Sequence, residues 1–174
     1  MAHYNQGQRK SIATINLGIQ VETGDLAATT YMATDDVAAL FAVKGRIRIM
    51  QLFGEVTTNL GGVAPVVRFR AAWTDPVIAA ADMSANSGDI SGLQVGARIT
   101  LVGTTVGTDT AITASRGVSY GTLAPQTVGL DGGTGWIGVV TSTNDVEAGE
   151  INWVINYLPL STGAVVTSDP RLIT

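Results

Sequence analysis

The sequence contains no cysteine, and its one histidine, His3, lies close to the first residue. Disulfide bonds, thiolate metal sites and Cys–His nucleophilic pairs are therefore excluded. Proton transfer near neutral pH would have to rely on carboxyl groups, because no histidine stands in the remaining chain. The 14 acidic residues lie mostly in turns rich in Gly, Ser and Asn. We therefore expect a protein without enzymatic activity, cofactor or small-molecule substrate.

Charge is scarce as well. Charged residues make up 14% of the chain, whereas a globular protein usually has about 25%. Much of the surface must then consist of Thr, Ser, Asn, Gly and Ala, or be covered by partners. The net charge of −4 argues against a nucleic-acid partner, because binding to duplex nucleic acid usually needs a basic stripe.

Long apolar runs are also missing. The longest, residues 37–43, has seven residues before Lys44, far fewer than the roughly 20 that a membrane-spanning helix needs. Residues 11–18 are too interrupted by polar side chains to form the apolar region of a signal peptide. We expect no association with a membrane.

The residues that are abundant favour strands. The chain has 21 glycines, with many Thr and Val but few Lys, Glu or Gln, which suits pleated strands and tight turns. We predict an all-β fold, an antiparallel β-sandwich or jelly-roll-like β-barrel formed by residues 31–174. Residues 74–96 fit a short helix or a projecting loop. The predicted strands are 46–56, 66–73, 97–102, 111–114, 136–143 and 150–158.

Alternation assigns faces to three of these strands. In the first strand Ile47, Ile49 and Gln51 share one face, and residues 59–62 follow as a turn that pairs it with the second strand. The remaining inward side chains are Val67, Phe69, Ala71 and Trp73 in the second strand, and Ile151, Trp153, Ile155 and Tyr157 in the last.

Pairing of the first two strands would bring four arginines onto one face. Arg46, Arg48, Arg68 and Arg70 would then repel one another. One interpretation is a solvated sheet face along which the arginine stems pack. The other is a surface that binds an acidic partner through bidentate hydrogen bonds.

Residues 1–30 are polar and weakly periodic, and we interpret them as an extended N-terminal arm. The arm is either a mobile terminus or a segment that becomes ordered on another subunit. Its candidate contacts are strand addition through the mostly alternating Ile12, Ile15, Leu17 and Ile19, and ion pairs of Arg9 and Lys10 with acidic groups.

Two further patterns have ordinary explanations. Residues 133–138 match the Gly-x-Gly-x-x-Gly spacing of a dinucleotide-binding loop, but a strand-like segment follows where a helix should begin, so we interpret them as a hairpin turn. The carboxylate and amide side chains in the turns do not match a calcium-binding loop, so we expect no metal site. These turn residues are Asp35, Asp36, Asp82, Asn86 and Asp89.

Two stretches of the chain resemble tailed-bacteriophage structural proteins. The first is LFAVKGRIRI at residues 40–49, continuing through LFGEVTT at 52–58, and the second is GEINWVINYLPL at 149–160, followed by STGAVV at 161–166. The resemblance implies a capsid decoration (cement) protein, or another head or fibre component. Such proteins are usually β-sandwiches or barrels that assemble as trimers.

The leading expectation is therefore a virion protein that binds the major capsid protein on the outer surface of the head and strengthens the shell. The low charge also favours a homo-oligomer, most simply a homotrimer, because assembly would bury neutral surface. The alternative is a carbohydrate- or receptor-binding module of a phage tail or fibre. Its sugar-stacking aromatics would be Trp73, Trp136 or Tyr120.

Overall fold

The computed structural model describes residues 18–101, 110–113 and 126–168. Strands dominate these ranges, and the one short helical element is a 3-10 turn, η1 (Ala28–Thr30). The strands are β1 (Ile19–Ala27), β2 (Val37–Lys44), β3 (Ile47–Gly62), β4 (Val66–Asp75), β5 (Val77–Asp82), β6 (Arg98–Leu101), β7 (Thr110–Thr113), β8 (Gln126–Val128), β9 (Thr134–Ser142), β10 (Val146–Pro159) and β11 (Val165–Ser168).

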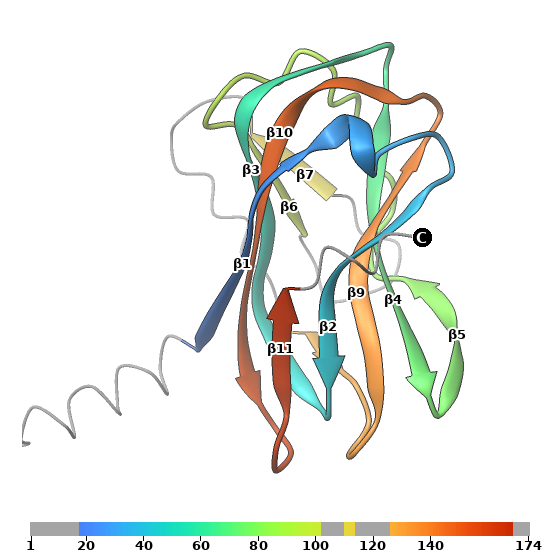
Figure 1. The fold of residues 1–174 in the computed structure, drawn as a ribbon, viewed down its shortest axis with the longest axis vertical. Coiled ribbons are helices and arrows are strands. Elements are labelled where there is room, and N and C mark those ends of the chain that lie inside the picture. Colours follow the sequence, from blue (N-terminus) through green and yellow to red (C-terminus); the bar gives the residue numbers. More distant parts are fainter. Residues whose placement is uncertain (1–17, 102–109, 114–125, 169–174) are drawn as a thin grey trace, which may run out of the picture.

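The strands form two antiparallel sheets that pack face to face (Figure 1). Sheet A has the order β1-β10-β3-β6-β7, and β8 pairs with the beginning of β3. Sheet B has the order β11-β2-β9-β4-β5. The fold is therefore a β-sandwich, one of the two all-β architectures that the sequence predicts.

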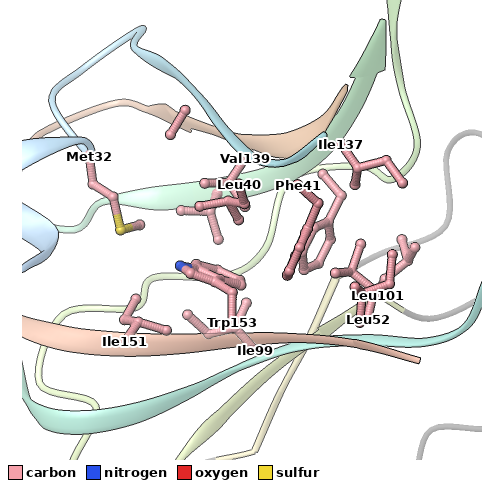
Figure 2. Close-up of a cluster of buried hydrophobic side chains, with 14 of the residues drawn as sticks. Met32, Leu40, Phe41, Leu52, Ile99, Leu101, Ile137, Val139, Ile151 and Trp153 are labelled. Atoms are coloured by element: carbon pink, nitrogen blue, oxygen red, sulfur yellow. The ribbon is translucent and has the colours of Figure 1, made fainter. Parts of the chain in front are cut away.

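The core lies between the two sheets. Figure 2 shows Leu40, Phe41, Ile137 and Val139 of sheet B facing Leu52, Ile99, Ile151 and Trp153 of sheet A. At its centre the ring of Trp153 meets that of Phe69, from β4, edge to face at a centroid distance of 5.8 Å. This aromatic pair joins the two sheets, and such pairs contribute about 0.5–1.5 kcal/mol beyond burial of area.

Alternation predicts the inward face of β10 correctly and that of β3 only in part. Ile151, Trp153, Ile155 and Tyr157 are all buried. In β3 Ile47 and Ile49 are buried, but Leu52 takes the next inward position in place of Gln51. The reason is a β-bulge: Ile49 pairs with Tyr157 and Gln51 with Asn156, so the intervening Met50 has no partner on β10. One extra residue reverses the alternation beyond it.

The predicted pairing of β3 with β4 is wrong. Residues 59–62, predicted as a turn, continue β3, and Leu60 is buried. The chain then crosses at residues 63–65 from sheet A to sheet B, where β4 pairs with β9 and β5. Both strands do have one apolar face, but these faces meet across the core and not within one sheet. Alternation reports which face is buried and says nothing about the sheet to which the neighbour belongs.

Residues 74–96 match the predicted loop at 83–96, but residues 77–82 form a strand that was not predicted. A cis Asp75–Pro76 bond leads into β5, which pairs with β4 as a hairpin. Beyond β5 the hydroxyls of Ser84 and Ser87 accept hydrogen bonds from the N–H groups of Phe69 and Val67, at 3.0 and 2.9 Å. Serine side chains thus continue the pairing of β4 after β5 has ended.

The sandwich begins earlier than residue 31, the predicted boundary of the N-terminal arm. Strand β1 pairs with β10 of the same chain from Ile19 to Ala27. Residues 19–27 therefore need no second subunit to become ordered, because β10 supplies main-chain partners, and Val21 and Leu26 pack against the core. Residues 1–17 lie outside the described residues, and so do Arg9, Lys10, Ile12 and Ile15 of the predicted arm.

Candidate functional site

The four predicted arginines do not form one patch. Arg48 lies on the outer face of sheet A, opposite Leu158 and Thr127 of its neighbours. Arg68 and Arg70 lie on the outer face of sheet B, on the other side of the molecule. Arg46 lies between β2 and β3. The predicted cluster was a consequence of the pairing of β3 with β4, and it disappears with that pairing.

Arg68 and Arg70 both bind one carboxylate, that of Asp82 at the end of β5. Asp82 Oδ1 lies 2.6 Å from Arg70 Nε, and its Oδ2 lies 3.1 Å from Arg68 Nε. Partial burial would by itself raise the pKa of Asp82, but the hydrogen bond from Arg70 and the charges of both arginines outweigh it and hold the pKa below its ordinary value. Arg70 and Asp82 are direct cross-strand partners, so this cluster holds the β4–β5 hairpin together.

Arg46 and Arg48 differ in what they contact. Arg46 Nε lies 3.5 Å from a carboxylate oxygen of Asp131, and both side chains are exposed, so this pair contributes little to stability. Arg48 is exposed and forms no ion pair with a described residue. Of the four arginines, Arg48 is thus the one that forms no ion pair with a described residue.

The free edge of β5 is an exposed apolar surface. Val77 is 87% exposed and Ile78 47% exposed, and the three alanines that follow are exposed too. Strand β5 pairs with β4 on one side, and no described strand covers its other side (Figure 1). Exposed apolar strand edges are templates for pairing with another chain.

An apolar groove lies beside this edge. It has a volume of about 210 Å³, several times the roughly 30 Å³ that a water molecule occupies. Its large apolar lining residues are Trp73, Ile78, Val128 and Leu130. Gly135 is the cross-strand partner of Trp73, and a Cβ atom there would lie 1.7 Å from the Trp73 ring. The glycine thus makes room for the indole that lines the groove.

Of the aromatic residues predicted for sugar stacking, Trp73 and Trp136 take different positions. Trp73 lies in the groove and packs partly against the core. Trp136 alternates with the buried Ile137 and so lies on the outer face of sheet B, where it is half-buried. Its cross-strand neighbours are the small residues Ala42 and Ala72. Tyr120 lies outside the described residues.

Comparison with known proteins gives no relative: no protein-family model matches the chain, and no curated protein or solved structure is significantly similar to it. Among the described residues no three acidic or histidine side chains are grouped so that they could hold a metal ion. The described chain also has no helix long and apolar enough to span a membrane.

Sequence reasoning missed the β5 edge. Residues 77–81 are Val-Ile-Ala-Ala-Ala, a run without polar alternation, so the sequence predicted a helix or loop there. The signal available was the absence of charge in a short apolar run directly after Asp75 and Pro76. Such a run usually marks a buried strand, and here it is exposed.

Proposed function

We propose that this chain is a non-enzymatic structural protein of a phage particle, a capsid decoration (cement) protein that acts as a homotrimer on the outer surface of the head. The resemblance of residues 40–58 and 149–166 to phage structural proteins motivates the proposal. The observation that carries it is the exposed apolar edge of β5, since Val77 and Ile78 would be unfavourably hydrated in a monomer. A protein that works in an assembly covers such an edge with a partner.

Sheet A supplies a second, polar surface for the shell. Along its outer face Asn156 donates a hydrogen bond to Gln51, and Arg98 donates to Glu55 at 2.7 Å while lying 4.7 Å above the ring of Phe53. These side chains pair with one another, whereas Arg48 is exposed and has no ion-pair partner among the described residues. We propose that Arg48 meets an acidic group of the major capsid protein.

The experiment is an inventory of purified particles by mass spectrometry with copy numbers. A decoration protein is expected in the head fraction at a fixed ratio to the major capsid protein, and heads without it should lose their DNA at lower temperature. Detection only in the tail fraction, or at a few copies per particle, would contradict a role on the head.

Charge reversal tests the attachment face. Arg48→Glu should weaken co-sedimentation with undecorated heads by tenfold or more, as expected for the loss of about 1.4 kcal/mol or more from a paired charge. The matched control is Lys44→Glu, which reverses an exposed charge at the end of β2 in sheet B. Equal binding of both variants and the parent would show that sheet A does not face the capsid.

One observation favours the alternative, a glycan-binding module. Trp136 lies on the outer face of sheet B between two alanines, and a ring in such surroundings can stack on a sugar. Titration with a glycan library should then show binding that Trp136→Ala abolishes. Binding that survives in this variant, or no binding by the parent, would leave the alternative without support.

A further inference from the structure

We propose that the outer face of sheet B binds a sugar that carries a carboxylate, a uronic acid, with Trp136 against the sugar ring and Arg70 on the carboxylate. The inference rests on the glycan-binding alternative, for which it names the class of sugar and a second binding residue. It is compatible with attachment to a head through sheet A, because the outer faces of the two sheets lie on opposite sides of the sandwich (Figure 1).

Trp136 and Arg70 are neighbours on this face. Both side chains point outward, since the residues that alternate with them, Ile137 and Phe69, lie in the core. Arg70 is two residues from Ala72, the cross-strand partner of Trp136. The two side chains therefore occupy diagonal positions on adjacent strands. Such positions lie about 7–8 Å apart, within reach of aromatic and long side chains.

The residues around the indole are small. Trp136 lies between Ala42 and Ala72 across the strands. Gly138 is the partner of Arg70, and a Cβ atom on this glycine would lie 1.9 Å from a main-chain oxygen of β2. The close approach of β2 thus excludes any larger residue at this position. No large side chain of these neighbours separates the indole from Arg70.

The arginines on this face carry more positive charge than they neutralise. Arg68 and Arg70 share the single carboxylate of Asp82. Arg68 Nη1 also donates to Asn86 and Ser142, at 3.2 and 3.3 Å. Arg70 donates to Asp82 through Nε, and its Nη1 and Nη2 form no hydrogen bond with a described residue. Terminal guanidinium nitrogens match the two oxygens of a carboxylate, so a second carboxylate fits on Arg70.

Asp82 also holds the Arg70 side chain in place. The 2.6 Å hydrogen bond from Nε orients the guanidinium, and the side chain is only 23% exposed. A side chain that is already ordered loses little conformational entropy when it binds a ligand. The net positive charge of the cluster favours an acidic sugar over a neutral one.

The indole decides between a sugar and an acidic peptide. A carboxylate alone needs only the arginines, whereas the half-buried Trp136 adds an aromatic face beside them. The C–H groups of a sugar ring pack on such a face, because its quadrupole is negative. A sugar acid engages both features with a single ring.

NMR titration of the full chain tests the site with methyl glucuronide and methyl glucoside, which differ in that a carboxylate replaces the hydroxymethyl group. The glucuronide should shift the indole N–H signal of Trp136 with a Kd about tenfold or more below that of the glucoside. The signals of the buried Trp153 and of Trp73, in the groove, should not move. Absence of a shift at Trp136, or a shift at Trp73 in its place, would overturn the proposal.

Two variants separate a direct role of Arg70 from its role in the β4–β5 hairpin. Arg70→Gln should bind both sugars with about equal affinity. Asp82→Asn also breaks the ion pair, but it keeps Arg70 and removes the competing charge, so it should bind the glucuronide more tightly than the parent. Weaker binding by both variants would show that Arg70 acts only through the hairpin and would overturn the proposal. The matched control, Arg98→Gln on sheet A, should retain the preference of the parent.

Further outcomes separate this inference from the proposed function. Equal affinity of the parent for the two sugars would contradict the role of Arg70 and leave the glycan-binding alternative standing. Binding of an aspartate-rich peptide that Trp136→Ala leaves unchanged, with no binding of the glucuronide, would assign the arginines to a protein partner and overturn the proposal. A parent chain that decorates heads in co-sedimentation but does not bind the glucuronide would contradict only the sugar site.

Discussion

The indole Nε1 of Trp153 donates a 2.9 Å hydrogen bond to the hydroxyl oxygen of Tyr31 inside the core. Both side chains are almost completely buried. Tyr31 follows the η1 turn, where the chain leaves β1 in sheet A for β2 in sheet B, so the bond fixes this crossover to the centre of β10. Burial raises the pKa of Tyr31 well above its ordinary value, an effect that the bond from Trp153 only partly offsets. The hydroxyl therefore stays neutral.

Loss of this bond should destabilise the protein while keeping the shape of the core. Tyr31→Phe leaves the buried indole N–H without its partner, and such a group costs about 1–3 kcal/mol. The expected result is a lower urea midpoint with an unchanged dependence on urea concentration. A midpoint equal to that of the parent would show that another group, such as water, replaces the hydroxyl.

Trp153 itself should be among the most sensitive residues. Trp153→Ala removes the ring that meets Phe69 and leaves a cavity between the sheets, at an expected cost of about 3–5 kcal/mol. The control is Trp136→Ala on the outer face of sheet B, where water fills the space and the loss should be clearly smaller. Thermal unfolding of both variants checks the difference, and equal losses would contradict the assignment of Trp153 to the core.

The ring of Trp153 leaves room only for a glycine at position 54. Gly54 pairs with Trp153 across β3 and β10, and a Cβ atom at this position would lie 2.7 Å from the Trp153 ring. Gly54→Ala should therefore cost about 1–3 kcal/mol by overpacking. Gly61→Ala in the same strand is the control, because its Cβ would approach Ala148 only to 3.1 Å. Chemical denaturation should show the larger loss in Gly54→Ala, and the reverse order would refute the explanation.

Acid should weaken the protein through two carboxyl groups. Hydrogen bonds from the hydroxyl and N–H of Thr34 lower the pKa of Asp145, and the pKa of Asp82 is lowered as described above. A pKa that is lower in the folded than in the unfolded state stabilises the fold above the unfolded value of about 4. This contribution is lost as the pH falls through the folded pKa.

The pH dependence can be measured by urea denaturation between pH 7 and pH 2. These two groups should change the free energy of unfolding little between pH 7 and about pH 4, and this free energy should fall progressively below that pH. Asp82→Asn should reduce the loss of stability in acid, whereas Glu147→Gln, at an exposed position of β10, should leave that loss unchanged. An acid response that is identical in Asp82→Asn and the parent would remove Asp82 from the explanation.

Much of the fold was predictable because side chains alternate along a strand whatever its neighbours are. The inward faces of β4 and β10 follow directly from Phe69, Trp153 and the residues that alternate with them. Gln51 was assigned to the wrong face, since a single unpaired residue, Met50, reverses the alternation and has no distinct sequence signature. Strand β1 was not predicted because its apolar pattern is weak. It is held by main-chain pairing with β10, a strand far from it in the sequence.

The sequence by itself determined that the chain is built from strands and turns and that Trp153 and Tyr157 are core residues. Only the tertiary structure decided which strands are neighbours. It placed Arg48 on one face and Arg68 with Arg70 on the other, and it left the apolar β5 at an open edge. The physical reason is that alternation along one strand shows which of its faces must be buried. It does not show which strands lie beside it, because the same apolar face can be buried by many different partners in the opposite sheet. The choice among such partners depends on the packing of the whole sandwich.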